Sequence, residues 1–221
     1  TYLSGPLDLW RFGSLTWVSD DSDVRSSIAV KPASITATDE IVSFGGTGSE
    51  TFPVQFGYNG GYSPGVHGLN LPLIQSRFVD NDPTKTFTRR SDNGVTEHAL
   101  TVPQNQLFLR FSLFDALTDG DDDLDMYVYY CGEDGSTCHR IGESGGPTSE
   151  EQFNLMRPAA GIYGVYIHGF ETDEINGGPG ANYQLLSWSI GDIDNKGNMS
   201  ASGPAFVAAG TVGEVTVTWT E

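Results

Sequence analysis

Alternation of apolar and polar residues is the main pattern along this chain. Between residues 107 and 113 every second side chain is apolar, at Leu107, Leu109, Phe111 and Leu113. The same period of two returns at Met126, Val128 and Tyr130. No window of a dozen residues keeps the i, i+3, i+4 spacing of an amphipathic helix without a Gly or Pro inside it. The pattern therefore predicts strands with one side in a core and the other in solvent.

Turn sequences separate the predicted strands. Asn-Gly-Gly occurs at 59–61, Asp-Gly at 119–120, and Asn-Gly-Gly-Pro-Gly at 176–180. Runs of this kind favour tight turns. Further strands are expected at 153–156, 162–170, 183–190 and 215–219. Short strands at this spacing predict an all-β fold made of antiparallel β-sandwich domains, jelly-roll or Ig-like.

The predicted strands divide the chain into a central domain and two flanks. Residues 84–192 contain enough strands for one complete sandwich, and β-rich flanks lie at 33–83 and 193–221. A weak repeat relates the flanks, because Ile35-Thr-Ala-Thr is echoed by Met199-Ser-Ala-Ser. The flanks are either two related β-units or one unit in which 193–221 pairs with 33–83. Since strand pattern is present from the first residues, we expect the chain to be part of a longer protein.

The charge of the chain limits its partners. The formal net charge is −18, with 29 acidic residues against 11 Lys and Arg. Nucleic acids and anionic membrane surfaces bind clustered cations, so neither is an expected partner. Two explanations for the acidity remain, namely solubility in an extracellular setting and carboxylates that bind calcium. The 12 Phe, 9 Tyr and 4 Trp supply enough large apolar surface for a real core.

Two cysteines, Cys131 and Cys138, flank a Gly- and Asp-rich stretch that is typical of a turn. One adjacent histidine, His139, does not complete a zinc site, and there is no second cysteine pair. We therefore predict a disulfide across a hairpin, worth about 2–3 kcal/mol. A disulfide requires an oxidising compartment, so the prediction extends to secretion.

An acidic segment is the first candidate site. Five aspartates lie within seven positions beside a turn glycine, and they are Asp119, Asp121, Asp122, Asp123 and Asp125. Crowded carboxylates repel one another unless a cation neutralises them, and calcium accepts such an oxygen-rich set. The spacing does not match an EF-hand, and a hydrated turn that discourages edge-to-edge strand pairing is the alternative. Asp123 and Asp125 stand at alternate strand positions and are expected to share a face.

Tyrosines form a second candidate site. The predicted strands carry them at alternate or nearby positions, at Tyr127, Tyr129, Tyr163 and Tyr166. Such a stripe is able to bind peptide or sugar rings on a flat face. The alternative is a half-buried sandwich surface with wet hydroxyl groups. His168 is expected to be a structural residue near a strand end.

A third segment, Gly142-Glu-Ser-Gly-Gly-Pro147, is similar to the Gly-Asp-Ser-Gly-Gly-Pro nucleophile motif of trypsin-like proteases. A trypsin-like enzyme that uses Ser144 also needs an early histidine base and a buried aspartate. None of the four histidines has the expected Ala-Ala-His-Cys context, and the catalytic segments of subtilisin are absent as well. We therefore expect a Gly-rich hairpin end here and no catalytic residue.

Residues near the N-terminus resemble a known domain of subtilisin-like proteases. Gly13-Ser-Leu-Thr-Trp is followed by a polar turn and by Val24-Arg-Ser-Ser-Ile-Ala-Val. This resembles the closing strands of the fibronectin-III-like domain that follows the catalytic domain in many subtilases, with Ser27 in place of a proline. The resemblance assigns residues 1–32 to the end of such a domain.

The central block resembles the pre-peptidase C-terminal type of domain found in secreted bacterial proteases. The resemblance is carried by Asp123-Leu-Asp-Met-Tyr-Val-Tyr, Ser149-Glu-Glu, Pro158 to Gly169, and Tyr183-Gln-Leu. It implies a non-catalytic C-terminal accessory region of a secreted, extracellular subtilisin-like serine protease.

This resemblance also implies partners. They are the protease's own catalytic domain and an insoluble or bulky protein substrate that the region anchors. A purely structural module for stability, secretion or maturation of the parent enzyme is the alternative.

Overall fold

The computed structural model describes residues 7–89, 94–173 and 180–220. The chain divides into two compact units. One unit contains residues 70–195, and the other combines residues 1–69 with 196–221. Nearly all regular structure is β, which confirms the predicted fold class. No helix in the described part of the chain is long and apolar enough to cross a membrane.

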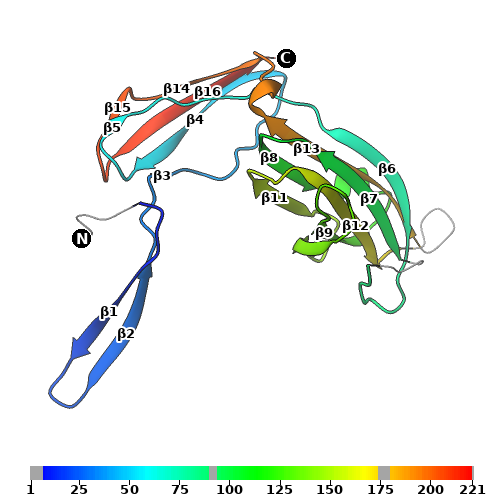
Figure 1. The fold of residues 1–221 in the computed structure, drawn as a ribbon, viewed down its shortest axis with the longest axis horizontal. Coiled ribbons are helices and arrows are strands. Elements are labelled where there is room, and N and C mark those ends of the chain that lie inside the picture. Colours follow the sequence, from blue (N-terminus) through cyan, green and yellow to red (C-terminus); the bar gives the residue numbers. More distant parts are fainter. Residues whose placement is uncertain (1–6, 90–93, 174–179, 221) are drawn as a thin grey trace. The chain divides into compact units, whose positions relative to one another are not determined.

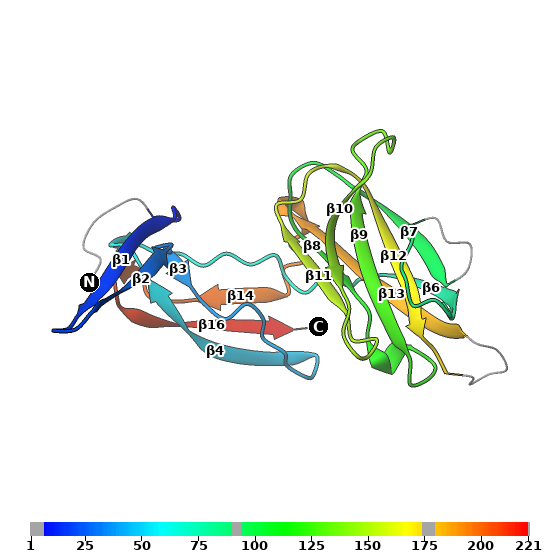
Figure 2. The same cartoon turned by 90° about the horizontal axis from the view of Figure 1, so that it is seen from below.

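Residues 70–195 form a sandwich of two four-stranded antiparallel sheets (Figures 1 and 2). The first sheet has the order β10-β9-β12-β7, with β7 Val95–Val102, β9 Asp123–Tyr130, β10 His139–Ser144 and β12 Gly161–Glu171. The second has the order β11-β8-β13-β6, with β6 Leu73–Asp80, β8 Gln106–Ser112, β11 Gln152–Met156 and β13 Gly180–Gly191. The 3₁₀ helices η1 (Asp115–Leu117) and η2 (Asp192–Asp194) are the only helices among the described residues.

The strand order identifies the kind of sandwich. If the strands β6 to β13 are counted from one to eight, the sheets read 1-8-3-6 and 2-7-4-5. Consecutive strands therefore change sheet at every step except from β9 to β10, which form a hairpin in one sheet. This order is that of a jelly roll, an eight-stranded double-sheet arrangement. Of the two sandwich types that the sequence left open, the sandwich has the jelly-roll order.

The core of the sandwich lies between the two sheets. Leu124, Met126 and Val128 of β9 are fully buried and belong to one hydrophobic cluster with Leu109 and Phe111 of β8. The alternation in the sequence thus corresponds to an inner face and an outer face, as predicted. At about 25 cal/mol per Å² of apolar area, each such side chain stabilises the fold by roughly 1.5–3 kcal/mol.

The first strand of the sandwich lies outside the range expected from sequence. Strand β6 falls in the segment 33–83, which the sequence analysis placed in a flank, yet it pairs with β13 over eight residues. Leu73, Ile74 and Phe78 of this strand are exposed, and only Val79 is deeply buried. Because β6 is an edge strand with a weak alternation, the sequence pattern could not assign it to the core.

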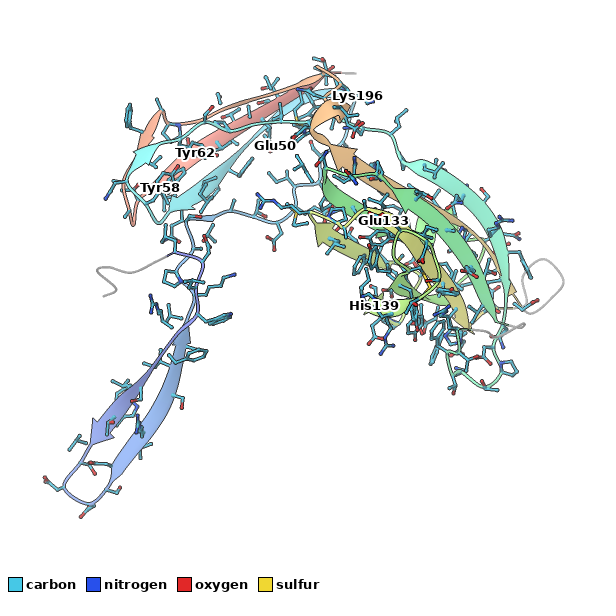
Figure 3. The ribbon with its side chains drawn as sticks, in the orientation of Figure 1. Glu50, Tyr58, Tyr62, Glu133, His139 and Lys196 are labelled. Atoms are coloured by element: carbon cyan, nitrogen blue, oxygen red, sulfur yellow. A yellow bond between two sulfur atoms is a disulfide. The ribbon has the colours of Figure 1, made fainter. Side chains whose placement is uncertain are left out.

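Cys131 and Cys138 form a disulfide with an S–S distance of 2.03 Å. It closes the connection between β9 and β10, which also carries Glu133 and ends at His139 (Figure 3). The predicted disulfide is confirmed.

The second unit contains a four-stranded sheet that joins the two flanks. Its order is β14-β16-β4-β3, with β3 Ile35–Thr36, β4 Thr47–Phe56, β14 Met199–Ser202 and β16 Val212–Thr220. Short strands β5 (Gly60–Gly61) and β15 (Phe206–Val207) pair beside it. Its small core consists of Val54, Phe56 and Val215, against which Tyr58 and Tyr62 pack (Figure 3).

A separate hairpin precedes this sheet. Strands β1 (Arg11–Val18) and β2 (Asp23–Val30) pair in antiparallel register from Arg11 opposite Val30 to Val18 opposite Asp23. All sixteen residues are exposed. The register puts apolar side chains on one side of the hairpin, at Leu15, Trp17, Val24, Ile28 and Val30.

Candidate functional site

The outer face of the sheet β10-β9-β12-β7 carries most of the predicted site residues. Leu124, Met126 and Val128 of β9 point into the core, so Asp125, Tyr127 and Tyr129 lie on the opposite side. In register beside them, β12 places His168 opposite Asp125 and Tyr166 opposite Tyr127. The strand period therefore groups acidic, aromatic and imidazole side chains on one surface of the sheet.

A segment without regular structure, residues 82–89, covers this surface, and we call it the strap. Phe87 of the strap stacks on Tyr127 with ring centroids 3.7 Å apart and also contacts Tyr129 and Tyr166. Arg89 lies over Tyr129, with its guanidinium carbon 5.3 Å from the ring centroid. The strap thus uses the tyrosines as its own packing surface.

The expected open stripe of four tyrosines is therefore corrected. Tyr163 is 1% exposed and belongs to the core, and its hydroxyl donates a hydrogen bond to the Ala159 carbonyl at 2.9 Å. Tyr166 is 3% exposed, and its hydroxyl donates to Glu97 at 2.7 Å. Only Tyr127 and Tyr129 remain half-buried. The sequence period could not reveal this, because the covering strap comes from a distant part of the chain.

A buried histidine between two carboxylates anchors the strap. Nε2 of His168 lies 2.9 Å from Oδ2 of Asp82, and Nδ1 lies 3.4 Å from Oδ2 of Asp125. Burial by itself lowers the pKa of His168, but the hydrogen bonds to Asp125 and Asp82 raise it above its ordinary value. Each ring nitrogen faces a carboxylate oxygen, an arrangement that favours the protonated imidazolium.

Asp82 organises the start of the strap around this ion pair. Its carboxylate accepts hydrogen bonds from the backbone N–H and hydroxyl of Thr84 and from the N–H of Thr86. Burial opposes ionisation of Asp82, but the bonds from His168, Thr84 and Thr86 lower its pKa to about 2. Since both nitrogens of His168 are engaged by carboxylates, the group works as a clamp and offers no free base for catalysis.

Ser144, the candidate nucleophile that the sequence analysis rejected, lies at the end of β10. Its hydroxyl donates to the buried carboxylate of Glu151 and accepts the N–H of Gln152 at 3.2 Å. The segment 142–147 leads from β10 in one sheet to β11 in the other, so it is a crossover between sheets and not the expected hairpin end. Gly145 allows a close approach here, because a Cβ would lie 2.5 Å from Oδ1 of Asp125.

The five predicted calcium ligands separate into two groups. Asp119, Asp121 and Asp122 stay in the loop before β9, where Asp121 and Asp122 meet Asp173 from the segment after β12. The N–H of Asp121 donates to Asp173 at 3.1 Å, and the N–H of Asp173 donates to Oδ1 of Asp122 at 3.0 Å. Asp122 is 5% exposed and its Oδ2 has no hydrogen-bond partner. Burial raises its pKa, and the carboxylates of Asp173, Asp119 and Asp121 raise it further.

Asp123 and Asp125 form the second group, on one face as expected. Burial raises the pKa of Asp123, and the charge of Asp125 adds to this effect. Glu151 lies close enough to raise that pKa as well. Within residues 7–89, 94–173 and 180–220, no three acidic, His or Cys side chains converge closely enough to enclose a metal ion.

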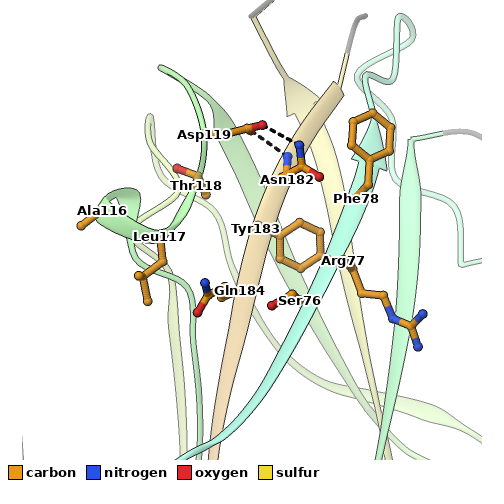
Figure 4. A pocket seen from close by; sticks show the side chains of 10 residues that line it. All are labelled: Ser76, Arg77, Phe78, Ala116, Leu117, Thr118, Asp119, Asn182, Tyr183 and Gln184. Carbon is orange, nitrogen blue, oxygen red and sulfur yellow. Dashed lines mark hydrogen bonds between the residues drawn. The ribbon is translucent and has the colours of Figure 1, made fainter. Parts of the chain in front are cut away.

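A shallow hollow of about 590 Å³ lies beside β6, η1 and β13 (Figure 4). Asp119 stands at its edge and accepts hydrogen bonds from the N–H and the side-chain amide of Asn182, at 2.7 and 2.6 Å (Figure 4). Tyr183, which also lines it, is 2% exposed and presents little of its ring. The Asp119 and Asn182 side chains at this hollow are thus already used to hold the loop against β13.

Comparisons with known proteins add little to this geometry. No protein-family model matches the chain, and no curated protein matches it. Among solved structures, the chain is similar to one described as accessory secretory protein 1, 2 and 3 in Streptococcus pneumoniae, at 11% identity and a TM-score of 0.26. That match covers 66% of this chain and 86% of the other. At so low a TM-score the likeness carries no argument about fold or function.

Sequence reasoning missed the residues that complete these groups. Asp82 lies 86 positions from His168, and Asp173 lies 51 positions from Asp122. The Asp-Pro-Thr start of the strap indicates a turn, but a turn signal does not name the distant partner of its aspartate. Only the β12–β9 register and the path of the strap bring these side chains together.

Proposed function

We propose that this chain is the non-catalytic C-terminal accessory region of an extracellular subtilisin-like serine endopeptidase, and that it anchors protein substrate for the enzyme. The observation that carries the proposal is the exposed apolar side of the hairpin β1–β2. Two-stranded hairpins are marginally stable alone, and Trp17 is 62% exposed. An apolar face of this kind is stabilised when a second sheet covers it. The closing strands of a fibronectin-III-like domain would have such a sheet.

The rest of the chain is compatible with this role. The jelly roll has its own core, so it is able to serve as an appended module. The disulfide suits an oxidising, extracellular location. In this proposal the catalytic domain of the parent enzyme is a partner, and the chain itself performs no catalysis.

Retention on insoluble protein tests the anchoring role. The purified chain is passed over collagen, elastin and casein solids, with cellulose and chitin as matched carbohydrate solids. Retention on a protein solid alone is the expected result. Retention on none of the five solids would contradict anchoring.

A purely structural module is the second candidate, and the strap favours it. Phe87 and Arg89 cover the tyrosines that a flat binding face would need. If this candidate is right, deletion of the chain from the parent protease lowers yield or melting temperature. Activity per folded molecule would then remain unchanged on both soluble and insoluble substrates.

We also propose that calcium stabilises the loop of Asp119, Asp121 and Asp122. The supporting observation is the buried Oδ2 of Asp122, which has no hydrogen-bond partner and lies near Asp173. An unpaired buried carboxylate beside like charges is costly, and a cation would relieve that cost. Carboxylates together with loop carbonyls suit calcium.

The melting temperature with calcium and with chelator tests the calcium proposal. Calcium is expected to raise it by several degrees, equivalent to about 1–2 kcal/mol. The variant Asp122→Asn keeps the oxygen that accepts the Asp173 N–H, and it is expected to lose the calcium response. Glu133→Gln also removes one negative charge, but from an exposed residue outside this loop, and it should keep the calcium response. The same melting temperature with calcium and with chelator would contradict the proposal.

A further inference from the structure

A hollow of about 490 Å³ opens beside Tyr127 on the outer side of the sheet β10-β9-β12-β7. Its walls are the carboxylates of Asp125 and Glu143 and the rings of Tyr127 and Phe170, and the backbone of Gly145 closes one side. The volume lies in the range of pockets that hold small ligands or single side chains.

The charged residues that line this hollow are two carboxylates, Asp125 and Glu143. Among the described residues that line it, none is cationic. Burial raises the pKa of Tyr127 to about 12, with a further contribution from the charges of Asp125 and Glu143. Oδ2 of Asp125 is used by His168, whereas Glu143 is exposed at the rim. The net charge of −18 for the whole chain adds a long-range attraction for cations.

Both aromatic walls already hold a cation from the chain itself. The guanidinium of Arg140 pairs with Glu143 at 2.6 Å and lies 6.0 Å from the centroid of Tyr127. The ammonium of Lys85 lies 4.9 Å from the centroid of Phe170. A cation over an aromatic face is worth about 0.5–1 kcal/mol at exposed sites. Arg140 is half exposed, so its side chain is free to leave Glu143 and Tyr127 when a competitor arrives.

We infer that this hollow binds the guanidinium or ammonium group of an Arg or Lys side chain of a protein ligand, and that Arg140 is its tethered competitor. Glu143 supplies the ion pair, Tyr127 and Phe170 supply aromatic faces, and Asp125 adds negative potential at the far side. The inference deepens the proposed anchoring function, on which it rests, by naming basic side chains as the feature of the substrate that is held.

The test is an NMR titration of the purified chain with the peptide acetyl-Gly-Arg-Gly-amide. The same peptide with citrulline in place of arginine is the matched ligand, because citrulline keeps the shape and removes the charge. The amide signals of Gly145 and Gly146 and the ring signals of Tyr127 are expected to shift. Citrulline should bind about tenfold more weakly, which corresponds to about 1.4 kcal/mol. Equal binding of the two peptides would overturn the inference.

Three variants separate this site from general attraction to an acidic protein. Glu143→Gln is expected to weaken arginine binding by about three- to tenfold, since it removes an ion pair at an aromatic wall. Arg140→Gln should strengthen it by about two- to fivefold, because the competitor is gone. Glu133→Gln, an exposed change of the same charge elsewhere, should have no effect. Equal weakening by Glu143→Gln and Glu133→Gln, or weakening by Arg140→Gln, would overturn the inference.

Retention on protein solids distinguishes failure of this inference from failure of the proposed function. If the chain is retained on casein or collagen and Glu143→Gln changes nothing, the basic-side-chain site is wrong and anchoring stands. If the arginine peptide binds at Gly145 and Tyr127 but no solid retains the chain, the site stands and anchoring is wrong.

Discussion

The jelly roll and the hairpin β1–β2 have the same alternation of apolar and polar residues and opposite burial. Leu124 in β9 is completely buried, whereas Leu15 in β1 is 43% exposed. The difference lies in what faces each strand. The jelly roll supplies two sheets whose inner faces meet, and the hairpin presents its apolar side without a second sheet among the described residues. A period of two thus specifies which face can be buried, and a partner sheet decides whether it is.

The largest effect is expected from the buried ion pair of the jelly roll, which has no counterpart among the described residues of the hairpin. His168→Gln leaves Asp82 and Asp125 without their cation and should destabilise the jelly roll by about 3–5 kcal/mol. Urea denaturation, followed region by region through NMR amide signals, measures this loss. His139→Gln removes an exposed histidine and should change stability by less than about 0.5 kcal/mol. A loss that small for His168→Gln would show that the clamp is not charged.

A matched pair of leucine truncations tests the comparison directly. Leu124→Ala creates a cavity and should cost about 2–5 kcal/mol, while Leu15→Ala should cost less than about 0.5 kcal/mol. The free energy of unfolding of each region gives the answer. Similar costs for the two variants would mean that the hairpin is covered in the isolated chain. If the proposed parent protease exists, a cost for Leu15→Ala that appears only in that longer protein would assign the covering sheet to it.

The disulfide provides a third, smaller effect that is confined to the jelly roll. Replacing both Cys131 and Cys138 by Ala opens a short loop and should cost about 2–3 kcal/mol. Chemical denaturation of the double variant and of the unaltered chain, both under oxidising conditions, measures this loss of stability. Signals of the sheet β14-β16-β4-β3 should not change. No loss of stability in the jelly roll would contradict the expectation that the disulfide stabilises the fold by restricting the unfolded chain.

The smallest effect per unit of change concerns pH, and two buried histidines should act in opposite directions. The folded-state pKa of His168 is raised, so its contribution is present below about 6.5 and is lost as pH rises through the folded value. Burial and Arg77 lower the pKa of His98 to about 4, so its contribution is lost as pH falls from about 6.5 toward 4. Each histidine changes the free energy of unfolding by at most about 1.4 kcal/mol per unit of pH.

NMR titration of the two imidazole rings measures both values. His98 is expected to stay neutral to about pH 4, because it is buried and bonded to the Tyr183 hydroxyl at 2.7 Å. His168 is expected to stay protonated above pH 6.5. Ordinary titration of both rings near 6.5 would contradict the assigned environments.

The sequence by itself determined the β-class, the inward face of β9 and the disulfide. Each depends on near neighbours in the chain, because a strand alternates every two residues and a tight turn brings Cys131 to Cys138. The shared face of Asp123 and Asp125 follows from the same period. These features need no knowledge of distant contacts.

The tertiary structure alone decided the jelly-roll order, the cover over the tyrosines and the clamp of Asp82, His168 and Asp125. It also places edge strand β6 in the sandwich and Asp173 beside Asp122. Each of these joins residues tens of positions apart. Many strand orders bury the same alternating faces, so local periodicity does not select among them. Which loop then crosses an outer face depends on the strand order that packing selects.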